Sequence, residues 1–250
     1  MLKSGGCTDL GRTRPLNEDG YYISQYSREY EALYAMVADG MGGHQAGEVA
    51  SSLAIREISE TVNQGFCVSM TETELKELLV KAIKQANHLI FDKGLSEKDK
   101  SGMGTTLTLC FIWNELCVVA HVGDSRAYLL RSGVLHQITK DHSLVQQLLD
   151  KGQITEIEAA CHPQRNVITR ALGTDAGVEI DLYAFELRAK DKILLCSDGL
   201  SNMLSDKMMT ELLTEGVADT PEAMVRQLVE EANVRGGYDN ITAVLLTKES

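Results

Sequence analysis

The chain is organised around one stretch, Val37-Ala38-Asp39-Gly40-Met41-Gly42-Gly43-His44, which follows the apolar run Ala32–Met36. A buried strand that ends in Asp-Gly places a carboxylate at the rim of a sheet. The glycines behind it let the backbone come close to whatever that carboxylate binds. Taken alone, the stretch fits a plain connection from a strand to a helix equally well.

The same pattern recurs at Lys192–Gly199, and the run Val118–Ser125 also ends in a small residue and an aspartate. Three such strand ends on one chain suggest a shared rim. Like charges held close together either raise a pKa or bind a cation. The candidate carboxylates for this rim are Glu18, Asp19, Asp39, Asp124, Asp198 and Asp239.

These candidate ligands all carry oxygen, without a clustered cysteine pair or a His-x-x-x-His motif beside them. Such a set favours a hard divalent ion, Mg²⁺ or Mn²⁺, over zinc, and its spacing is not that of an EF-hand loop. If Asp39 bridges two ions, the site could activate a water for in-line displacement at phosphorus. The sequence therefore indicates metal-assisted chemistry on a phosphate.

Arg14 and His44 each have two interpretations. The Arg14 guanidinium could grip a phosphate with two hydrogen bonds, or form a salt bridge to Glu18 or Asp19. His44 could stabilise the Gly-rich turn, or act as a general acid or orient a water. The histidines at 88 and 121 lie in a predicted helix and strand, where we expect structural roles.

Composition narrows the classes of partner. The 250 residues carry a net charge of −12, and 44% of them are hydrophobic, which is enough for a real core. An acidic surface repels nucleic acid and anionic lipid, so neither is an expected partner. The six cysteines show no Cys-x-x-Cys spacing. With no signal-like or membrane-spanning run, they suggest free thiols in a cytoplasmic protein.

The length of the chain fits one domain or two small ones. Hydrophobic periodicity predicts an α+β fold with strands in adjacent hairpins and helices in pairs. That order favours antiparallel sheets covered by helices over a doubly wound parallel sheet. Residues 141–171 have another character, with two short helical pieces (143–151 and 155–161), and suggest a flap in which His142 and His162 could gate substrates. The other predicted helices cover 45–62, 71–92, 206–215 and 221–234. The predicted strands cover 21–26, 32–39, 104–113, 116–122, 126–131, 134–138, 179–187, 192–196 and 241–247.

Together these motifs resemble the metal-dependent serine/threonine protein phosphatases, the PPM or type 2C family, in their compact bacterial form. The resemblance covers essentially the whole chain, and the order and spacing of its motifs make it specific. The matching pieces are Arg14-x-x-Asn17-Glu18-Asp19, Asp39–His44, Met103–Thr106, His121–Arg126, Lys140–Ser143, Cys196–Leu200 and Gly236–Thr242.

The resemblance implies a four-layer α-β-β-α sandwich with two ions, Mn²⁺ or Mg²⁺, at one end of two antiparallel sheets. It implies that Asp39 bridges the ions, that the Gly40 carbonyl binds one, and that Asp198 and Asp239 complete the ligands of the second. Glu18 and Asp19 would act through metal-bound water, and Arg14 would hold the substrate phosphate. Many bacterial members hold a third ion, whose ligands match Asp124 and Asp198. In the flap, the resemblance makes Asp141, His142 and Ser143 candidates for tuning substrate choice.

The chain departs from many eukaryotic members at Met41, where they carry a histidine proposed as the general acid. The acid is therefore unassigned, and His44 and a metal-bound water are the candidates. The implied function is hydrolysis of phosphoserine and phosphothreonine in proteins, opposing a bacterial Ser/Thr kinase, by a monomer. The alternatives are a pseudophosphatase that only binds phosphoproteins and an enzyme of the same fold with one narrow regulatory target.

Overall fold

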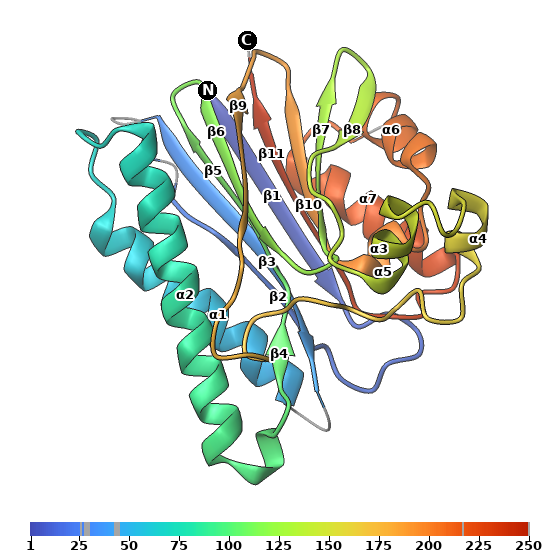
Figure 1. Ribbon diagram of the computed structural model, residues 1–250. Coiled ribbons are helices and arrows are strands. Elements are labelled where there is room, and N and C mark those ends of the chain that lie inside the picture. The colour runs from blue at the N-terminus through green and yellow to red at the C-terminus, as the bar shows by residue number, and fades with distance from the viewer. Residues whose placement is uncertain (26, 28–30, 43–45, 217, 250) are drawn as a thin grey trace.

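The computed structural model describes residues 1–25, 27, 31–42, 46–216 and 218–249 (Figure 1). Within these ranges the helices are α1 (Ala46–Gly65), α2 (Glu72–Ser96), α3 (Leu144–Asp150), α4 (Glu156–Ala160), α5 (Asp198–Ser201), α6 (Asp206–Thr214) and α7 (Pro221–Val234), with a 3-10 turn at Lys98–Lys100. The strands are β1 (Leu2–Asp9), β2 (Asp19–Ile23), β3 (Ala32–Met41), β4 (Gly104–Thr105), β5 (Leu107–Trp113), β6 (Leu116–Val122), β7 (Arg126–Arg131), β8 (Val134–Gln137), β9 (Asp181–Glu186), β10 (Lys192–Cys196) and β11 (Ile241–Lys248).

The strands form two antiparallel sheets. One has the order β1-β11-β10-β7-β8, and the other has the order β2-β3-β5-β6-β9 with β4 added beside β3. In the second sheet Asp19 lies directly opposite Asp39, because the β2–β3 register pairs these residues. The prediction of antiparallel sheets is confirmed.

The side chains of each strand alternate between two hydrophobic cores. On β3, Tyr34 and Met36 pack toward α1 and α2, whereas Leu33 and Val37 pack between the two sheets. A strand with a side-chain period of two buries both faces only when it lies inside a layered structure. The middle strands therefore carry nearly continuous apolar runs.

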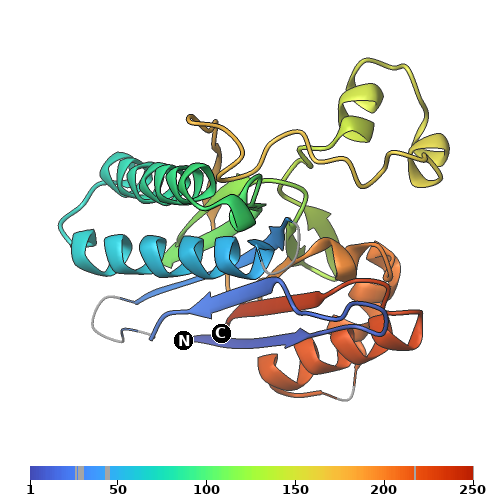
Figure 2. The same ribbon diagram turned by 90° about the horizontal axis from the view of Figure 1, so that it is seen from below.

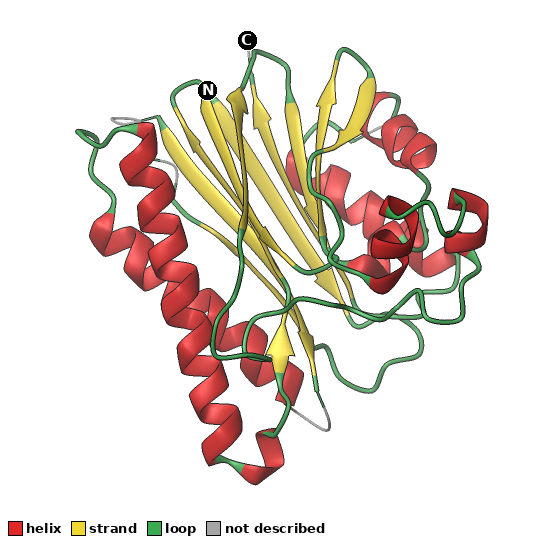
Figure 3. Cartoon of the chain, viewed as in Figure 1, coloured by secondary structure: helices red, strands yellow, loops and turns green. Residues whose placement is uncertain are grey.

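Helix pairs cover the two outer faces. Helices α1 and α2 lie on the sheet that contains β3, and α6 and α7 lie on the sheet that contains β11 (Figures 1 and 3). Viewed from below, the layers follow one another as helices, sheet, sheet and helices (Figure 2). The expected four-layer α-β-β-α sandwich is the observed fold.

Strand β1 was not predicted, because its sequence Leu-Lys-Ser-Gly-Gly-Cys-Thr-Asp lacks a clear apolar alternation. The strand pairs along its full length with β11, which brings the two chain ends together (Figure 1). A Cβ at Gly5 would lie 2.2 Å from the backbone nitrogen of Glu222, at the start of α7. The glycine that obscures the strand pattern is what lets α7 pack against β1.

Several boundaries differ from the prediction. Strand β3 continues to Met41, so Asp39 lies inside the strand, because β4 pairs with Gly40 and Met41. The strand predicted over 104–113 is broken at Thr106, and the helix predicted to end before Gly94 continues to Ser96. Strand β2 ends at Ile23 rather than at residue 26, which lies outside the described residues.

The flap crosses from β8 to β9 and carries α3 and α4, as the sequence predicted; it projects away from the sandwich in Figure 2. Ser143 and Thr155 cap the two helices through their hydroxyl groups. The two ends of the flap are joined where the backbone N–H of Thr169 donates to the carbonyl of His142 at 2.7 Å. None of the helices that the structure describes is long and apolar enough to cross a bilayer.

Candidate metal centre and active site

Asp39 lies at the junction of three strands. Its backbone N–H donates to the Thr106 hydroxyl at 2.9 Å, and its carbonyl accepts from the Thr106 backbone N–H at 2.8 Å. The break between β4 and β5 therefore serves the site, because it turns Thr106 toward Asp39. The Thr106 hydroxyl also contacts the Ser125 hydroxyl at 2.8 Å, which ties β3 to the segment that carries Asp124.

The other candidate aspartates come from elements of both sheets. Asp19 begins β2, Asp124 lies two residues after β6, Asp198 begins α5 after β10, and Asp239 lies two residues before β11. Repulsion from all four contributes to the raised pKa of Asp39, after the larger effect of its burial. The structure thus brings these five carboxylates to one end of the sandwich.

Burial and mutual repulsion oppose ionisation of this cluster. Burial, followed by repulsion from Asp198 and Asp239, raises the pKa of Asp19 to about 7. Burial, followed by repulsion from Asp198 and Asp141, raises the pKa of Asp124 to about 8. Burial and then repulsion from Asp239 raise the pKa of Asp198 as well. Without a cation, such a group of charges is costly to hold together.

Two carboxylate oxygens of the cluster indicate that the site binds cations. Oδ1 of Asp19 and Oδ1 of Asp124 are buried and have no hydrogen-bond partner among the described residues. Buried carboxylate oxygens normally find a donor or a metal ion. The donor set is all oxygen, which suits Mg²⁺ or Mn²⁺. The residues present therefore fit divalent cations.

The carboxylates do not form a closed cage. In the described ranges, no three acidic, histidine or cysteine side chains are gathered tightly enough to hold an ion by themselves. Hard cations such as Mg²⁺ usually keep several waters and use few protein ligands. A backbone carbonyl such as that of Gly40, together with water, would have to complete the coordination.

Glu18 and Gly40 are held beside Asp39 by close backbone packing. The Gly40 N–H donates to the Glu18 carbonyl at 3.1 Å, and Glu18 Oε1 accepts from the Gly47 N–H at 3.1 Å, at the start of α1. A Cβ at Gly40 would lie only 2.1 Å from the Gly47 carbonyl oxygen. Burial raises the pKa of Glu18, while the Gly47 N–H opposes that shift.

Asn240 and Ser197 fix the position of the acidic pair Glu18-Asp19. The Asn240 side chain accepts from the Glu18 backbone N–H at 2.9 Å and donates to the carbonyls of Leu10 and Leu16. The Ser197 hydroxyl donates to Asp19 Oδ2 at 2.7 Å. Both residues stood in motifs that the sequence singled out, but these long-range partners could not be inferred from spacing.

Arg14 reaches the centre through another carboxylate than the sequence suggested. Its Nη2 donates to Asp239 Oδ2 at 2.7 Å, rather than to Glu18 or Asp19, the partners that the sequence suggested for a salt bridge. The side chain remains 48% exposed, so the guanidinium keeps N–H groups that face solvent at the edge of the cluster. This placement leaves it available to a phosphate that approaches the carboxylates.

A cavity of about 480 Å³ separates the flap from the carboxylates; its lining includes Asp124, Asp198, Asp141, Ser143 and Arg165. Arg126 holds Asp141 with two donors, Nε to Oδ1 at 2.9 Å and Nη2 to Oδ2 at 2.7 Å. The flap therefore starts at an ion pair beside the acidic centre.

The histidines considered in the sequence lie at different places relative to the cavity. His142 is buried, with Nδ1 accepting from the Gly123 N–H at 3.0 Å, and it does not line the cavity. His121 is buried beside it, and burial lowers its pKa to about 3, which fits the predicted structural role. His162 accepts from the Gln164 N–H within a turn of the flap. His44 lies outside the described residues.

Comparison with known proteins agrees with this arrangement. A family model described as protein phosphatase 2C matches residues 12–242. The chain is 40% identical to the serine/threonine phosphatase stp of Listeria monocytogenes over 242 residues, which cover 97% of this chain and 94% of that protein. The structure of this chain is similar to that of the S. agalactiae serine/threonine phosphatase, with a TM-score of 0.91, 36% identity and 100% of both chains covered.

A second similar structure is that of the catalytic domain of the phosphatase PstP in complex with two manganese ions. Its TM-score is 0.85 at 38% identity, with 100% of this chain and 99% of that chain covered. The family model spans most of this chain, and both solved structures share the fold of the whole chain. This chain belongs to the protein phosphatase 2C family.

Proposed function

We propose that this protein is a metal-dependent phosphatase that hydrolyses phosphoserine and phosphothreonine in other proteins. The observation that carries the proposal is the cluster of five buried or half-buried aspartates, two of them with a buried oxygen that has no partner among the described residues, beside the half-exposed guanidinium of Arg14. The membership of the chain in the protein phosphatase 2C family supports the same activity.

We assign the ligands of two cations to Asp39, the Gly40 carbonyl, Asp198 and Asp239, and those of a third to Asp124 with Asp198. Bound divalent cations would activate a water and stabilise the oxygens of an in-line displacement at phosphorus. The manganese ions in PstP support Mn²⁺, and Mg²⁺ fits the same oxygen ligands.

Other residues of the chain would orient the reactants. Glu18 is fixed by Gly47 and Asn240, and Asp19 by Ser197, so their remaining oxygens have set directions for accepting protons from water. Arg14 would hold two phosphate oxygens in a bidentate grip. His44, or a water at the centre, would supply the proton to the leaving hydroxyl group.

The flap would select the substrate around the phosphorylated residue. Asp141 and Ser143 line the cavity next to the acidic centre, where they would face the substrate, whereas the buried His142 would act by anchoring the flap.

We propose that residues 1–250 act as one catalytic domain, because the carboxylates come from both sheets. The pseudophosphatase alternative is disfavoured by the complete carboxylate set. The general enzyme is preferred to one with a single regulatory target, because the similar proteins are named serine/threonine phosphatases.

We also propose that the protein works as a cytoplasmic monomer and opposes a bacterial Ser/Thr kinase. The homologous serine/threonine phosphatases of bacteria support this setting. The net charge of −12 argues against nucleic acid and anionic membranes as partners.

The activity is tested by phosphate release from a phosphothreonine peptide and from para-nitrophenyl phosphate, with Mn²⁺, with Mg²⁺ and with chelator. We expect turnover only in the presence of a divalent ion. Folded protein that binds the phosphopeptide but releases no phosphate with either ion would instead support a phosphoprotein-binding module.

The role of Arg14 is tested by Arg14→Ala. Loss of a bidentate phosphate contact should raise KM for the phosphopeptide about tenfold or more, while the melting temperature changes little because the side chain is half exposed. Arg12→Ala, in the same loop, is the control and should leave KM within about twofold. An unchanged KM in Arg14→Ala would remove Arg14 from the phosphate site.

A further inference from the structure

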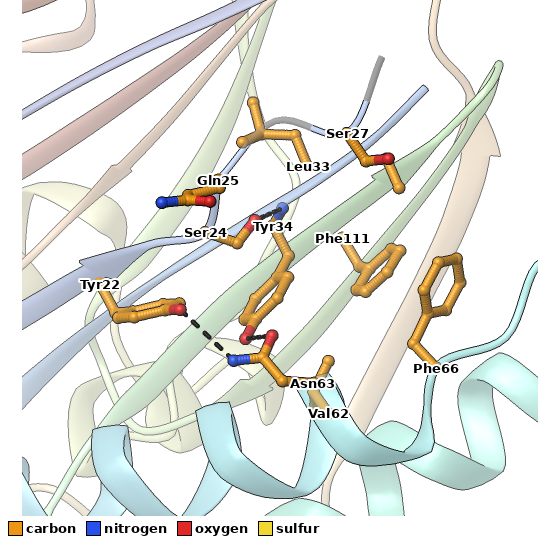
Figure 4. Close-up of a pocket in the computed structure, with 11 residues that line it drawn as sticks. Tyr22, Ser24, Gln25, Ser27, Leu33, Tyr34, Val62, Asn63, Phe66 and Phe111 are labelled. Carbon is orange, nitrogen blue, oxygen red and sulfur yellow. Dashed lines mark hydrogen bonds between the residues drawn. The ribbon is translucent and has the colours of Figure 1, made fainter. Parts of the chain in front are cut away.

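A separate pocket of about 420 Å³ lies where the end of α1 meets β2, β3 and β5 (Figure 4). We call it the aromatic pocket, after the rings of Tyr22, Tyr34, Phe66 and Phe111 in its wall. Its volume is in the range of sites that hold small molecules. Nothing in the proposed phosphatase chemistry uses these residues.

The rings of the wall are held in fixed orientations. The rings of Tyr34 and Phe111 are parallel, with an interplanar angle of 1° and centroids 5.4 Å apart, and both residues are buried. Phe66 packs against Phe111 at 4.9 Å, and Tyr22 against Tyr34 at 5.5 Å. Pre-oriented ring faces and edges favour another planar ring as the occupant.

Polar atoms stand among the rings. The Tyr34 hydroxyl donates to Asn63 Oδ1 at 2.7 Å, and Asn63 Nδ2 donates to the Tyr22 hydroxyl at the long distance of 3.5 Å (Figure 4). An amide carries two N–H donors, so Asn63 can serve a further acceptor. The Ser24 hydroxyl accepts from the Tyr34 backbone N–H at 2.9 Å and can donate its own hydrogen. A ring with a hydroxyl or similar group would find partners here.

The pocket is uncharged in the part of the chain that the structure describes. All of its lining residues are neutral, although 24% of the residues of the chain are charged. A charged ligand would lose its hydration without gaining an opposite charge. The described lining residues therefore favour a neutral occupant over a phosphopeptide or free phosphate.

The pocket is also remote from the metal centre. Asp39 lies five positions after Tyr34 along β3, which is about 17 Å of extended strand. Along α1, Asn63 lies about 24 Å from Gly47, which holds Glu18. A molecule in the aromatic pocket and a substrate at the metal centre can thus be bound at the same time.

We propose that the aromatic pocket is a binding site for a neutral aromatic small molecule that carries one hydrogen-bonding group, such as a phenol. The site is independent of the proposed hydrolysis, and its occupant is not the substrate. Rings, polar atoms and neutrality are its three recognition features, and each can be tested separately.

The probe for the experiment is para-cresol, with 4-methylbenzoate as its charged counterpart. Trp113, the single tryptophan, packs edge-on against Phe66 with centroids 5.6 Å apart, so its fluorescence reports on the pocket wall. We expect para-cresol to change that fluorescence saturably, and 4-methylbenzoate to bind at least about tenfold more weakly.

Variants assign the binding to the pocket. Ser27→Phe fills the pocket and should raise the Kd for para-cresol about tenfold, and Asn63→Ala should raise it about threefold. Gln64→Ala changes the next amide on α1, outside the pocket lining, and should leave the Kd within about twofold. KM for the phosphopeptide should not change with para-cresol.

Three results would overturn the proposal. The first is the lack of any saturable change in wild-type protein. The second is binding that is unaffected by Ser27→Phe. The third is competition between para-cresol and the phosphopeptide, which would place the ring in the catalytic channel.

Discussion

At the scale of single residues, the candidate metal centre holds closely spaced carboxylates whose ionised forms are costly in the folded chain. Asp19 and Asp124 each carry one buried carboxylate oxygen that has no hydrogen-bond partner among the described residues. Sites that perform chemistry commonly carry such local costs, which a bound ligand offsets. Cation binding should therefore contribute directly to the stability of the folded chain.

The first prediction concerns the pH dependence of the metal-free protein. The pKa values of Asp19, about 7, and Asp124, about 8, lie above the ordinary 3.8, so the folded state holds protons that the unfolded chain releases. This stabilisation is present in acid and is lost as the pH rises from about 4 through about 8. In chelator, stability should fall by about 4 kcal/mol between roughly pH 6 and pH 8.

Thermal melts in chelator and in Mn²⁺ across this pH range measure the effect. Asp124→Asn should flatten the slope in chelator and weaken the gain from Mn²⁺, while Asp99→Asn, at an exposed position, should change neither. A metal-free protein whose stability increases with pH would contradict the account of the carboxylate cluster.

The sequence predicted which carboxylates lie together at one end of the sandwich where the pattern was local, at the ends of buried strands. The repeated Asp-Gly and Gly-Asp strand ends identified Asp39, Asp124 and Asp198, because a buried strand fixes which end reaches the rim. The Arg14–Asp239 pair was missed because its partners are 225 positions apart in the sequence. Spacing along the chain carries no information about such a contact.

At the scale of elements, β1 shows how packing overrides a weak pattern. Gly5 disfavours a strand by propensity, yet the close approach of α7 requires it. We expect Gly5→Ala to lower the free energy of unfolding by more than about 2 kcal/mol, because backbone atoms rather than a flexible side chain occupy the space.

Chemical denaturation of Gly5→Ala and Gly177→Ala checks this prediction. A Cβ at Gly177 would meet nothing within 4 Å, so the control should stay within about 0.5 kcal/mol of wild type. Equal effects of the two substitutions would show that the β1–α7 contact is looser than described.

The flap is the other element whose attachment can be tested. Arg126 and Arg131, near the two ends of β7, each hold an aspartate with two donors, Asp141 and Asp191 respectively. Lysine keeps the charge but loses the forked geometry. Arg126→Lys and Arg131→Lys should each cost about 1–2 kcal/mol of stability.

Only Arg126→Lys should also reduce kcat/KM for the phosphopeptide, by about tenfold, because Asp141 starts the flap beside the metal centre. Steady-state kinetics on both variants separate the two effects. A loss of activity of the same size in Arg131→Lys would indicate a general effect of destabilisation rather than a role for the flap anchor.

At the scale of the whole molecule, the order of hairpins and helix pairs predicted antiparallel sheets covered by helices, and the family resemblance implied the four layers. The sequence did not predict the order of strands in the sheets, because β1 and β11 pair from opposite ends of the chain. That pairing also draws Asp239 toward β2 and β3. The carboxylate cluster is thus a property of the complete sandwich, to which both sheets contribute.

The most direct test of the account is phosphate release from a phosphothreonine peptide by wild type and Asp39→Asn, with Mn²⁺ and with chelator. Circular dichroism on the same samples reports folding. We predict metal-dependent turnover in wild type and a loss of about a thousandfold or more in a folded Asp39→Asn protein. Wild-type turnover in chelator, or by Asp39→Asn, would contradict the proposed role of the aspartate cluster in catalysis.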